Sequence, residues 1–124
     1  MKYISFCICL LLISCSGSKN IVDKPIIFDE DRDHLTLEYL SERYGIEQDS
    51  PTITPKIIVL HWTAIPTLER SFNAFYNSAL PNWRPEIQSA SGLNVSAHFL
   101  VDQDGTIYRL MPETKMARHT IGLN

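Results

Sequence analysis

The sequence has few cysteines, and all of them lie near its amino terminus. Cys7, Cys9 and Cys15 are the three cysteines of the 124-residue chain, so residues 16–124 hold neither a disulfide framework nor a cysteine-based zinc site. Blocks of lysine and arginine are also missing, and 11 basic residues against 14 acidic ones give a net charge of −3. The charge pattern is not that of a nucleic-acid-binding surface, and we expect no nucleic-acid partner.

No apolar run in the sequence is long enough to cross a bilayer. The longest spans residues 3–13, whereas a membrane-spanning helix needs roughly 20 apolar residues. The overall content, 44% apolar and 20% charged residues, is typical of a globular chain and excludes a multi-span membrane protein or a disordered one. The length allows one small domain.

The amino terminus has the features of an export signal. The basic pair at residues 1–2 is followed by the apolar run YISFCICLLLI, whose length is typical of a signal-peptide core. The run ends in Leu-Ile-Ser before Cys15, which resembles the bacterial lipobox, where cleavage precedes a cysteine that then carries lipid. A signal for a soluble protein and a buried helix are the alternatives.

The lipobox resemblance predicts a lipoprotein signal peptide over residues 1–14 and lipidation of Cys15. We then expect the protein in the bacterial cell envelope, held to the membrane by its lipid, because several acyl chains anchor a protein stably. Ser16 after the cysteine favours the outer membrane, with the protein facing the periplasm. Residues 15–33 are polar and acidic around the apolar patch 25–28, and predict a tether. Disorder, or packing of that patch on the domain, are the alternatives.

The predicted domain occupies residues 34–124 and begins with two helices. Apolar spacing predicts one helix over 34–44, with Asp33 as its N-cap and Gly45 after its end. A second helix is predicted over about 67–78, with Pro66 at its first position. Its apolar stripe consists of Leu68, Phe72, Phe75 and Ala79.

Three strands are predicted around these helices. The continuous apolar run at 56–60 is typical of a buried strand, and 95–101 and 106–110 form a hairpin about an Asp-Gly turn. Residues 80–92 and 111–124 are expected to be irregular. The order predicts an α/β or α+β fold, a mixed β-sheet with packed helices that is incomplete at its carboxyl end.

Histidines are the main candidates for chemistry. His61 directly follows the predicted buried strand, at the sheet edge where ligand sites occur, and is a candidate metal ligand or general base, or else structural. His98 lies within a predicted strand and is expected to be a hydrogen-bonded core or near-core residue. His119 lies in a predicted loop and is expected either to contact a ligand or to be an ordinary exposed histidine. We expect His34 to be an ordinary surface residue.

The sequence contains no known catalytic motif that would identify the reaction. A hydrolytic zinc site needs three protein ligands and an open position, and the sequence has no HExxH or paired-histidine spacing. The nucleophile-elbow pattern GxSxG and a glycine-rich phosphate loop are also missing. The residues by themselves therefore leave the reaction open.

Four segments in order point to a family. They are Ile57–Ala64 (IIVLHWTA), Asn94–Val101 (NVSAHFLV), Asp104–Tyr108 (DGTIY) and Ala117–Asn124 (ARHTIGLN). Together they resemble the zinc-dependent N-acetylmuramoyl-L-alanine amidases, whose fold is shared by phage lysozyme-type amidases and peptidoglycan recognition proteins. The resemblance covers residues 56–124. It implies hydrolysis of the amide bond between N-acetylmuramic acid and L-alanine, with zinc as cofactor and peptidoglycan or muropeptides as partners.

The resemblance also implies roles for single residues. His61 matches the first zinc ligand, His98 a supporting histidine, and His119, with Asn124, the substrate groove. Ala97 stands where some members carry a catalytic tyrosine, and members with alanine there use a glutamate instead. That glutamate and the other two zinc ligands would lie beyond Asn124. The sequence is thus expected to be an amino-terminal fragment, inactive alone, with its catalytic residue unknown.

Two other functions stay open at this point. One is a non-catalytic envelope lipoprotein that binds peptidoglycan through the groove at His119. The other is a structural envelope lipoprotein whose similarity to the amidases is due to chance.

Overall fold

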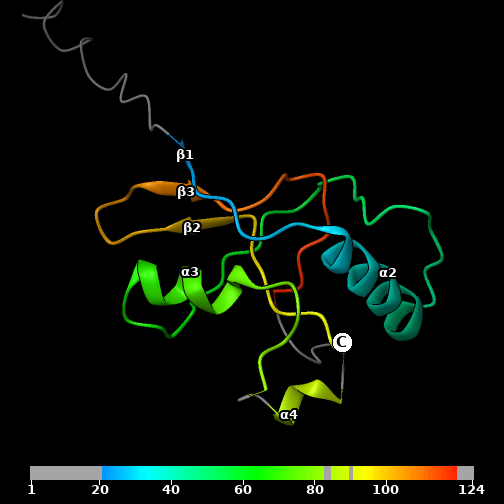
Figure 1. The fold of residues 1–124 in the computed structure, drawn as a ribbon. Coiled ribbons are helices and arrows are strands. Elements are labelled where there is room, and N and C mark those ends of the chain that lie inside the picture. The colour runs from blue at the N-terminus through cyan, green and yellow to red at the C-terminus, as the bar shows by residue number, and fades with distance from the viewer. Residues whose placement is uncertain (1–20, 83–84, 90, 120–124) are drawn as a thin grey trace, which may run out of the picture.

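The computed structural model describes residues 21–82, 85–89 and 91–119. In this part of the chain a small sheet packs with one face against α3 (Figure 1). Helix α2 lies at the opposite end of the molecule from the sheet. The elements in order are β1 (Ile21–Asp23), α2 (Glu30–Tyr44), α3 (Leu68–Tyr76), α4 (Pro85–Gln88), β2 (Phe99–Val101) and β3 (Ile107–Arg109). The predicted fold class, a mixed sheet with packed helices, is confirmed.

The sheet has the order β1-β3-β2. β2 and β3 form the predicted antiparallel hairpin, in which Phe99 pairs with Arg109. Gly105 adopts a φ of 85° in the connecting turn, and its N–H donates to the Asp102 carbonyl at 2.9 Å. A left-handed φ is readily available to glycine, which explains the Asp-Gly pair. The strands are shorter than predicted, because the residues before β2 pair instead with the segment that follows β3.

Residues 21–33 belong to the domain, so the prediction of a tether is wrong for them. β1 pairs in parallel with β3. Ile26 is buried in the core, and Phe28 packs against that core. The alternative, in which the apolar patch packs on the domain, is therefore the correct one. Backbone hydrogen bonds continue past β1, such as that from the Ile26 N–H to the Leu110 carbonyl (3.0 Å). A strand of three residues held by backbone pairing has no side-chain pattern from which it could be predicted.

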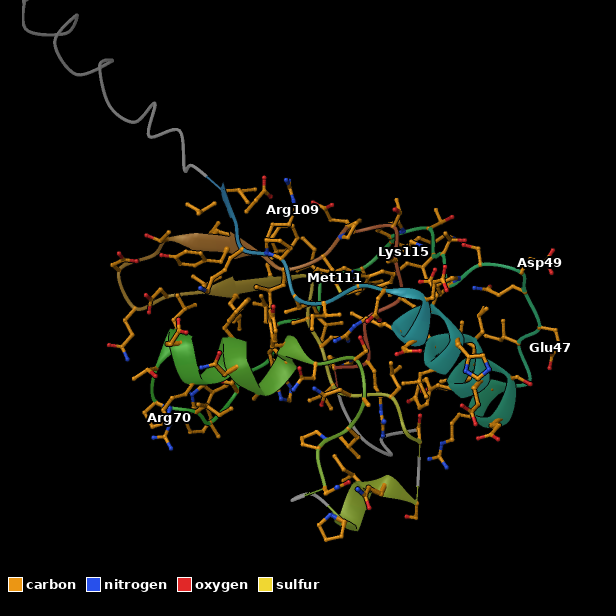
Figure 2. The ribbon with its side chains drawn as sticks, in the orientation of Figure 1. Glu47, Asp49, Arg70, Arg109, Met111 and Lys115 are labelled. Carbon is orange, nitrogen blue, oxygen red and sulfur yellow. The ribbon has the colours of Figure 1, made fainter. Side chains whose placement is uncertain are left out.

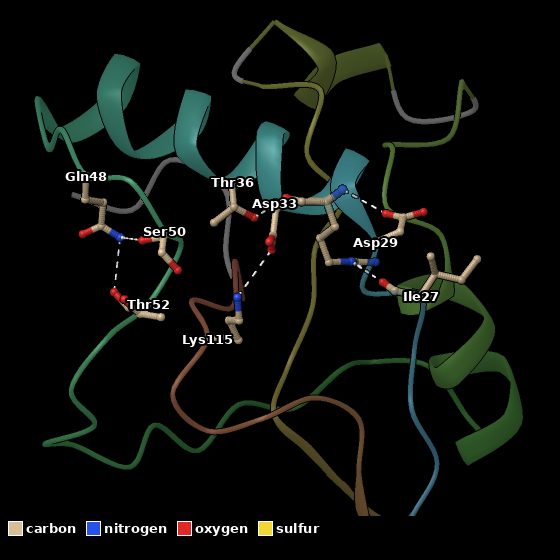
Figure 3. Close-up of polar contacts among 9 residues, drawn as sticks. Ile27, Asp29, Asp33, Thr36, Gln48, Ser50, Thr52 and Lys115 are labelled. Carbon is tan, nitrogen blue, oxygen red and sulfur yellow. Dashed lines mark hydrogen bonds and ion pairs between the residues drawn. The ribbon is translucent and has the colours of Figure 1, made fainter.

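Helix α2 starts earlier than predicted. Its N-cap is Asp29 and not Asp33, because the Asp29 carboxylate accepts a hydrogen bond from the Arg32 N–H at 3.0 Å (Figure 3). It also accepts one from the Ser78 hydroxyl at 2.8 Å. The bonds from Arg32 and Ser78, in that order, lower the pKa of Asp29. Gly45 ends the helix at a φ of 63°, as predicted.

Helix α3 is the predicted amphipathic helix. Its N-cap is Thr67, whose hydroxyl accepts from the Arg70 N–H at 3.3 Å, so Pro66 precedes the cap and does not occupy the first helical position. Met111 lies near the middle of the molecule (Figure 2). The buried core cluster consists of Ile26, Phe72, Leu100, Leu110 and Met111.

The side chain of Arg32 joins α2 to the end of α3. Only 1% exposed, it donates from Nη2 to the carbonyls of Phe75 (3.1 Å) and Asn77 (2.7 Å), and from Nε to that of Ile27 (2.5 Å). Helix α3 has no basic residue in its own last turn, so Arg32 supplies the cation that a helix carboxyl end favours. Burial lowers the Arg32 pKa to about 10, which leaves the group charged at neutral pH.

The predicted strand at residues 56–60 is wrong. The segment is extended, but no backbone hydrogen bond joins it to another described segment. Ile58 is 89% and Leu60 93% exposed. A continuous apolar run becomes a strand only where neighbouring strands and covering layers exist, and the described residues provide neither here. Residues 80–92 also differ from prediction, since they include the one-turn helix α4.

Within the described ranges, no helix is both long and apolar enough to cross a membrane.

Replacing Arg32 tests its role in joining the helices. We expect Arg32→Met to lower the free energy of unfolding by about 2–4 kcal/mol, because several buried carbonyls lose a charged donor. Urea unfolding followed by circular dichroism measures the change. The control is Arg43→Met at the exposed end of the same helix, with an expected loss below about 1 kcal/mol. Equal losses in the two variants would contradict the role assigned to Arg32.

Candidate functional site

The structure brings two of the candidate histidines together. The rings of His61 and His119 meet edge to face, with centroids 5.9 Å apart and an interplanar angle of 77°. Both residues are exposed. His61 belongs to the extended segment before α3, and His119 to the irregular segment after β3. Each was a candidate by itself, and their contact was not predicted.

Pairing of neighbouring segments explains this contact. The Ile53 N–H donates to the Thr114 carbonyl at 2.8 Å, and the Met116 N–H donates to the Pro51 carbonyl at 2.9 Å. After Ile53 the chain separates from the segment that follows β3. It contacts that segment again at His61, whose ring meets the ring of His119. This pairing brings the segment that leads to His61 beside the segment that ends in His119.

A strained turn follows His61 along the chain. Ala64 has a φ of 57°, in the left-handed region that non-glycine residues rarely adopt. The Ile65 N–H donates to the Thr63 hydroxyl at 3.3 Å, and that hydroxyl lies 3.3 Å from the Ser71 hydroxyl of α3. Strain of this kind is often found at functional sites, where the surrounding structure fixes it.

The environment of the pair favours a neutral imidazole on His119. Burial, and secondly the charge of His61, lower the pKa of His119. A neutral imidazole has one nitrogen able to accept a hydrogen bond or bind a metal, and one that donates. His119 therefore presents a hydrogen-bond donor and an acceptor to a ligand without adding charge.

The other two histidines have the expected places. His98 is half-buried, and its Nε2 lies 2.7 Å from the Lys115 carbonyl, to which it donates. This bond ties the start of the hairpin to the segment that leads to His119. His34 is exposed on α2. Asn124 and Cys15 lie outside the described residues.

A complete zinc site is not found in the described part of the chain. No group of three or more histidine, cysteine, aspartate or glutamate residues there is placed to hold a metal ion. A hydrolytic zinc site uses three protein ligands, so the pair of His61 and His119 does not fit one by itself. A depression of about 330 Å³ at the start of α3 includes Glu69 and Asp102 but neither of these histidines.

Sequence reasoning missed several buried polar residues behind the pair. Asn94, Ser96 and Arg118 are each 2% exposed. The Asn94 amide donates to the carbonyls of Ala74 and Asn77, both at 2.9 Å, and so fixes its segment to the end of α3. All three lie in the segments that carry the amidase resemblance, which was the available signal, but their burial depends on contacts distant in sequence.

Comparison with known proteins gives one match. The model of the family described as N-acetylmuramoyl-L-alanine amidase matches residues 48–124, which is more than half of the chain. The matched region includes His61, His98 and His119. Neither the curated proteins nor the solved structures contain a match.

The pH dependence of His119 tests the geometry of the pair. We expect His119 to titrate below the ordinary histidine value in the folded protein, and to return to that value in urea. His61→Ala removes the neighbouring charge and should raise the pKa of His119, while the effect of burial persists. Histidine ring signals in NMR report both titrations. An unchanged His119 titration in His61→Ala would contradict the contact.

Proposed function

The chain belongs to the N-acetylmuramoyl-L-alanine amidase family, and we propose on that basis that it serves hydrolysis of the amide bond between N-acetylmuramic acid and L-alanine in peptidoglycan. The observation that carries the proposal is the contact of His61 and His119 within the matched region. A chance similarity does not account for a match of this extent.

We assign His119 and the surface beside it to recognition of the substrate. In the proposed arrangement His61 is the first zinc ligand and His119 faces the muropeptide. Trp62, beside His61, is 83% exposed and offers a large apolar surface with one N–H donor. Asn124 belongs to the same groove by resemblance. Together these groups provide an apolar face and hydrogen-bond donors and acceptors, which suit an uncharged sugar and amide.

Zinc is part of the proposal through the family, which generally depends on it. In such enzymes the metal polarises a carbonyl and activates water. The described residues bring His61 to the site without two further ligands, so they do not fit a complete zinc centre, and we assign no catalytic step to the metal here.

A non-catalytic peptidoglycan-binding protein is the second candidate. The two-histidine site favours it, because recognition needs no complete metal centre. The two functions differ in what His61 does. The amidase function predicts weak zinc binding that depends on His61, whereas the binding function predicts none.

The polypeptide of residues 1–124 allows a direct test. We expect it to sediment with purified sacculi, with or without chelator, and to release no muropeptide. His119→Ala should weaken sedimentation about tenfold, the effect of losing about 1.4 kcal/mol of binding energy. His34→Ala is the matched control and should bind as the unsubstituted chain does. Calorimetry with zinc measures the metal affinity and its dependence on His61.

Two outcomes would contradict parts of this account, the first the incomplete zinc site and the second the recognition of peptidoglycan. One tightly held zinc per chain, together with amidase turnover, would show that the chain holds a complete site. Failure to bind sacculi would remove the assignment of the histidine pair to peptidoglycan.

We further propose that Cys15 carries lipid and holds the protein in the bacterial cell envelope, at the outer membrane facing the periplasm. The proposal rests on the sequence Leu-Ile-Ser-Cys at the end of the apolar run. The residues involved lie outside the described part of the chain.

Labelling with a radioactive fatty acid tests the anchor. We expect the label on the wild-type protein in the membrane fraction, and its loss in Cys15→Ser. Cys9→Ser, within the predicted signal peptide, is the control and should keep the label. Label on the Cys15→Ser protein would contradict lipidation at this residue.

A further inference from the structure

Arg118 is a buried cation directly before His119. Its side chain is 2% exposed, and its guanidinium carbon lies 4.9 Å from the centre of the Tyr39 ring on α2. Nη1 donates to the Leu93 carbonyl. The backbone is fixed as well, since the Arg118 N–H donates to the Ser96 hydroxyl at 3.2 Å and the Ser96 N–H donates to the Arg118 carbonyl at 2.7 Å. Arg118 thus connects both α2 and the segment 93–96 to its neighbour His119.

The hydrogen bonding of Arg118 is poor for a buried charge. Its Nε and Nη2 are buried and have no hydrogen-bond partner among the described residues. Arg32 leaves one buried donor, Nη1, without a partner among the described residues, but its Nη2 donates to the carbonyls of Phe75 and Asn77 at the end of α3 and its Nε to the carbonyl of Ile27. A buried cation with unused donors is destabilising compared with an apolar side chain of similar size. A contribution to the stability of the fold therefore does not by itself explain why an arginine occupies position 118.

The connection between Arg118 and His119 offers a different explanation. Arg118 is buried whereas His119, the next residue, is exposed, so the two side chains leave the backbone in different directions. The bonds to Leu93 and Ser96 and the contact with Tyr39 set the position of the Arg118 backbone. That position determines where the His119 ring meets His61.

We propose that Arg118 is a positioning residue, which holds His119 against His61 through its anchoring to Tyr39 and Leu93. The inference rests on the proposed function only in linking this pair to peptidoglycan. The planar guanidinium both stacks on Tyr39 and reaches the Leu93 carbonyl. A lysine keeps the charge but lacks the planar fork that does both.

Contact between the two rings is the primary measurement. In the full chain with labelled histidines, we expect nuclear Overhauser effects between the ring protons of His61 and His119, and their loss in Arg118→Lys. The control is Arg109→Lys on the outer side of the sheet (Figure 2), where the native arginine pairs with Asp23 and Glu113. This control should keep the contact. Retention of the contact in folded Arg118→Lys would overturn the proposal.

A second variant covers the case in which Arg118→Lys does not fold. Tyr39→Leu removes the aromatic face but leaves the bond from Arg118 to the Leu93 carbonyl. We expect a weaker ring contact in this variant while its circular dichroism stays that of the unsubstituted protein. An undiminished contact would overturn the anchoring through Tyr39.

Binding to sacculi separates this inference from the proposed function. We expect binding by Arg118→Lys to fall about tenfold, a loss of about 1.4 kcal/mol, and binding by Arg109→Lys to stay unchanged. If the unsubstituted chain does not bind but Arg118→Lys still loses the ring contact, the proposed function fails and the positioning role stands. If the contact and the binding both persist in Arg118→Lys, the positioning role fails and the proposed function stands.

Discussion

The buried guanidinium of Arg32 closes the carboxyl end of α3, where α2 and the segment before the hairpin meet. It meets the partial negative charge of the helix end, for which α3 has no basic residue of its own. The same helix end receives the amide of Asn94, so the segment before the hairpin is fixed there too. Ser96 then pairs with Arg118, which precedes His119. A series of polar contacts thus leads from the centre of the fold to the exposed histidine pair.

Local patterns were sufficient to predict the elements with their own sequence signals. The two amphipathic helices, Gly45 after the first of them and the Asp-Gly hairpin were all found from spacing and turn chemistry. Elements defined by partners elsewhere in the chain were not. β1 is a backbone pairing with β3, and the choice of Asp29 over Asp33 as cap depends on Ser78. The prediction of a strand at 56–60 was wrong for the opposite reason. This run has the residue pattern of a strand but no neighbouring strand to pair with among the described residues.

The sequence was sufficient to predict which residues belong to the candidate site, but not how they are arranged. His61 and His119 were identified from position and resemblance, yet only the structure shows that their rings meet. Nothing in the sequence marks Arg118 as buried, since arginine is usually exposed and its contacts with Tyr39 and Leu93 are distant along the chain. Family membership supports the proposed chemistry, and the buried polar contacts explain how the chain positions the segment that ends in His119.

The central claim is that the surface formed by His61 and His119 recognises the muramoyl-peptide part of peptidoglycan. Titration of a soluble N-acetylmuramoyl peptide into the labelled chain, followed by NMR, tests it most directly. The account predicts saturable shifts centred on His61, Trp62 and His119, with His34 on α2 unaffected. Shifts centred on α2, or no shifts at concentrations that saturate binding to sacculi, would contradict it.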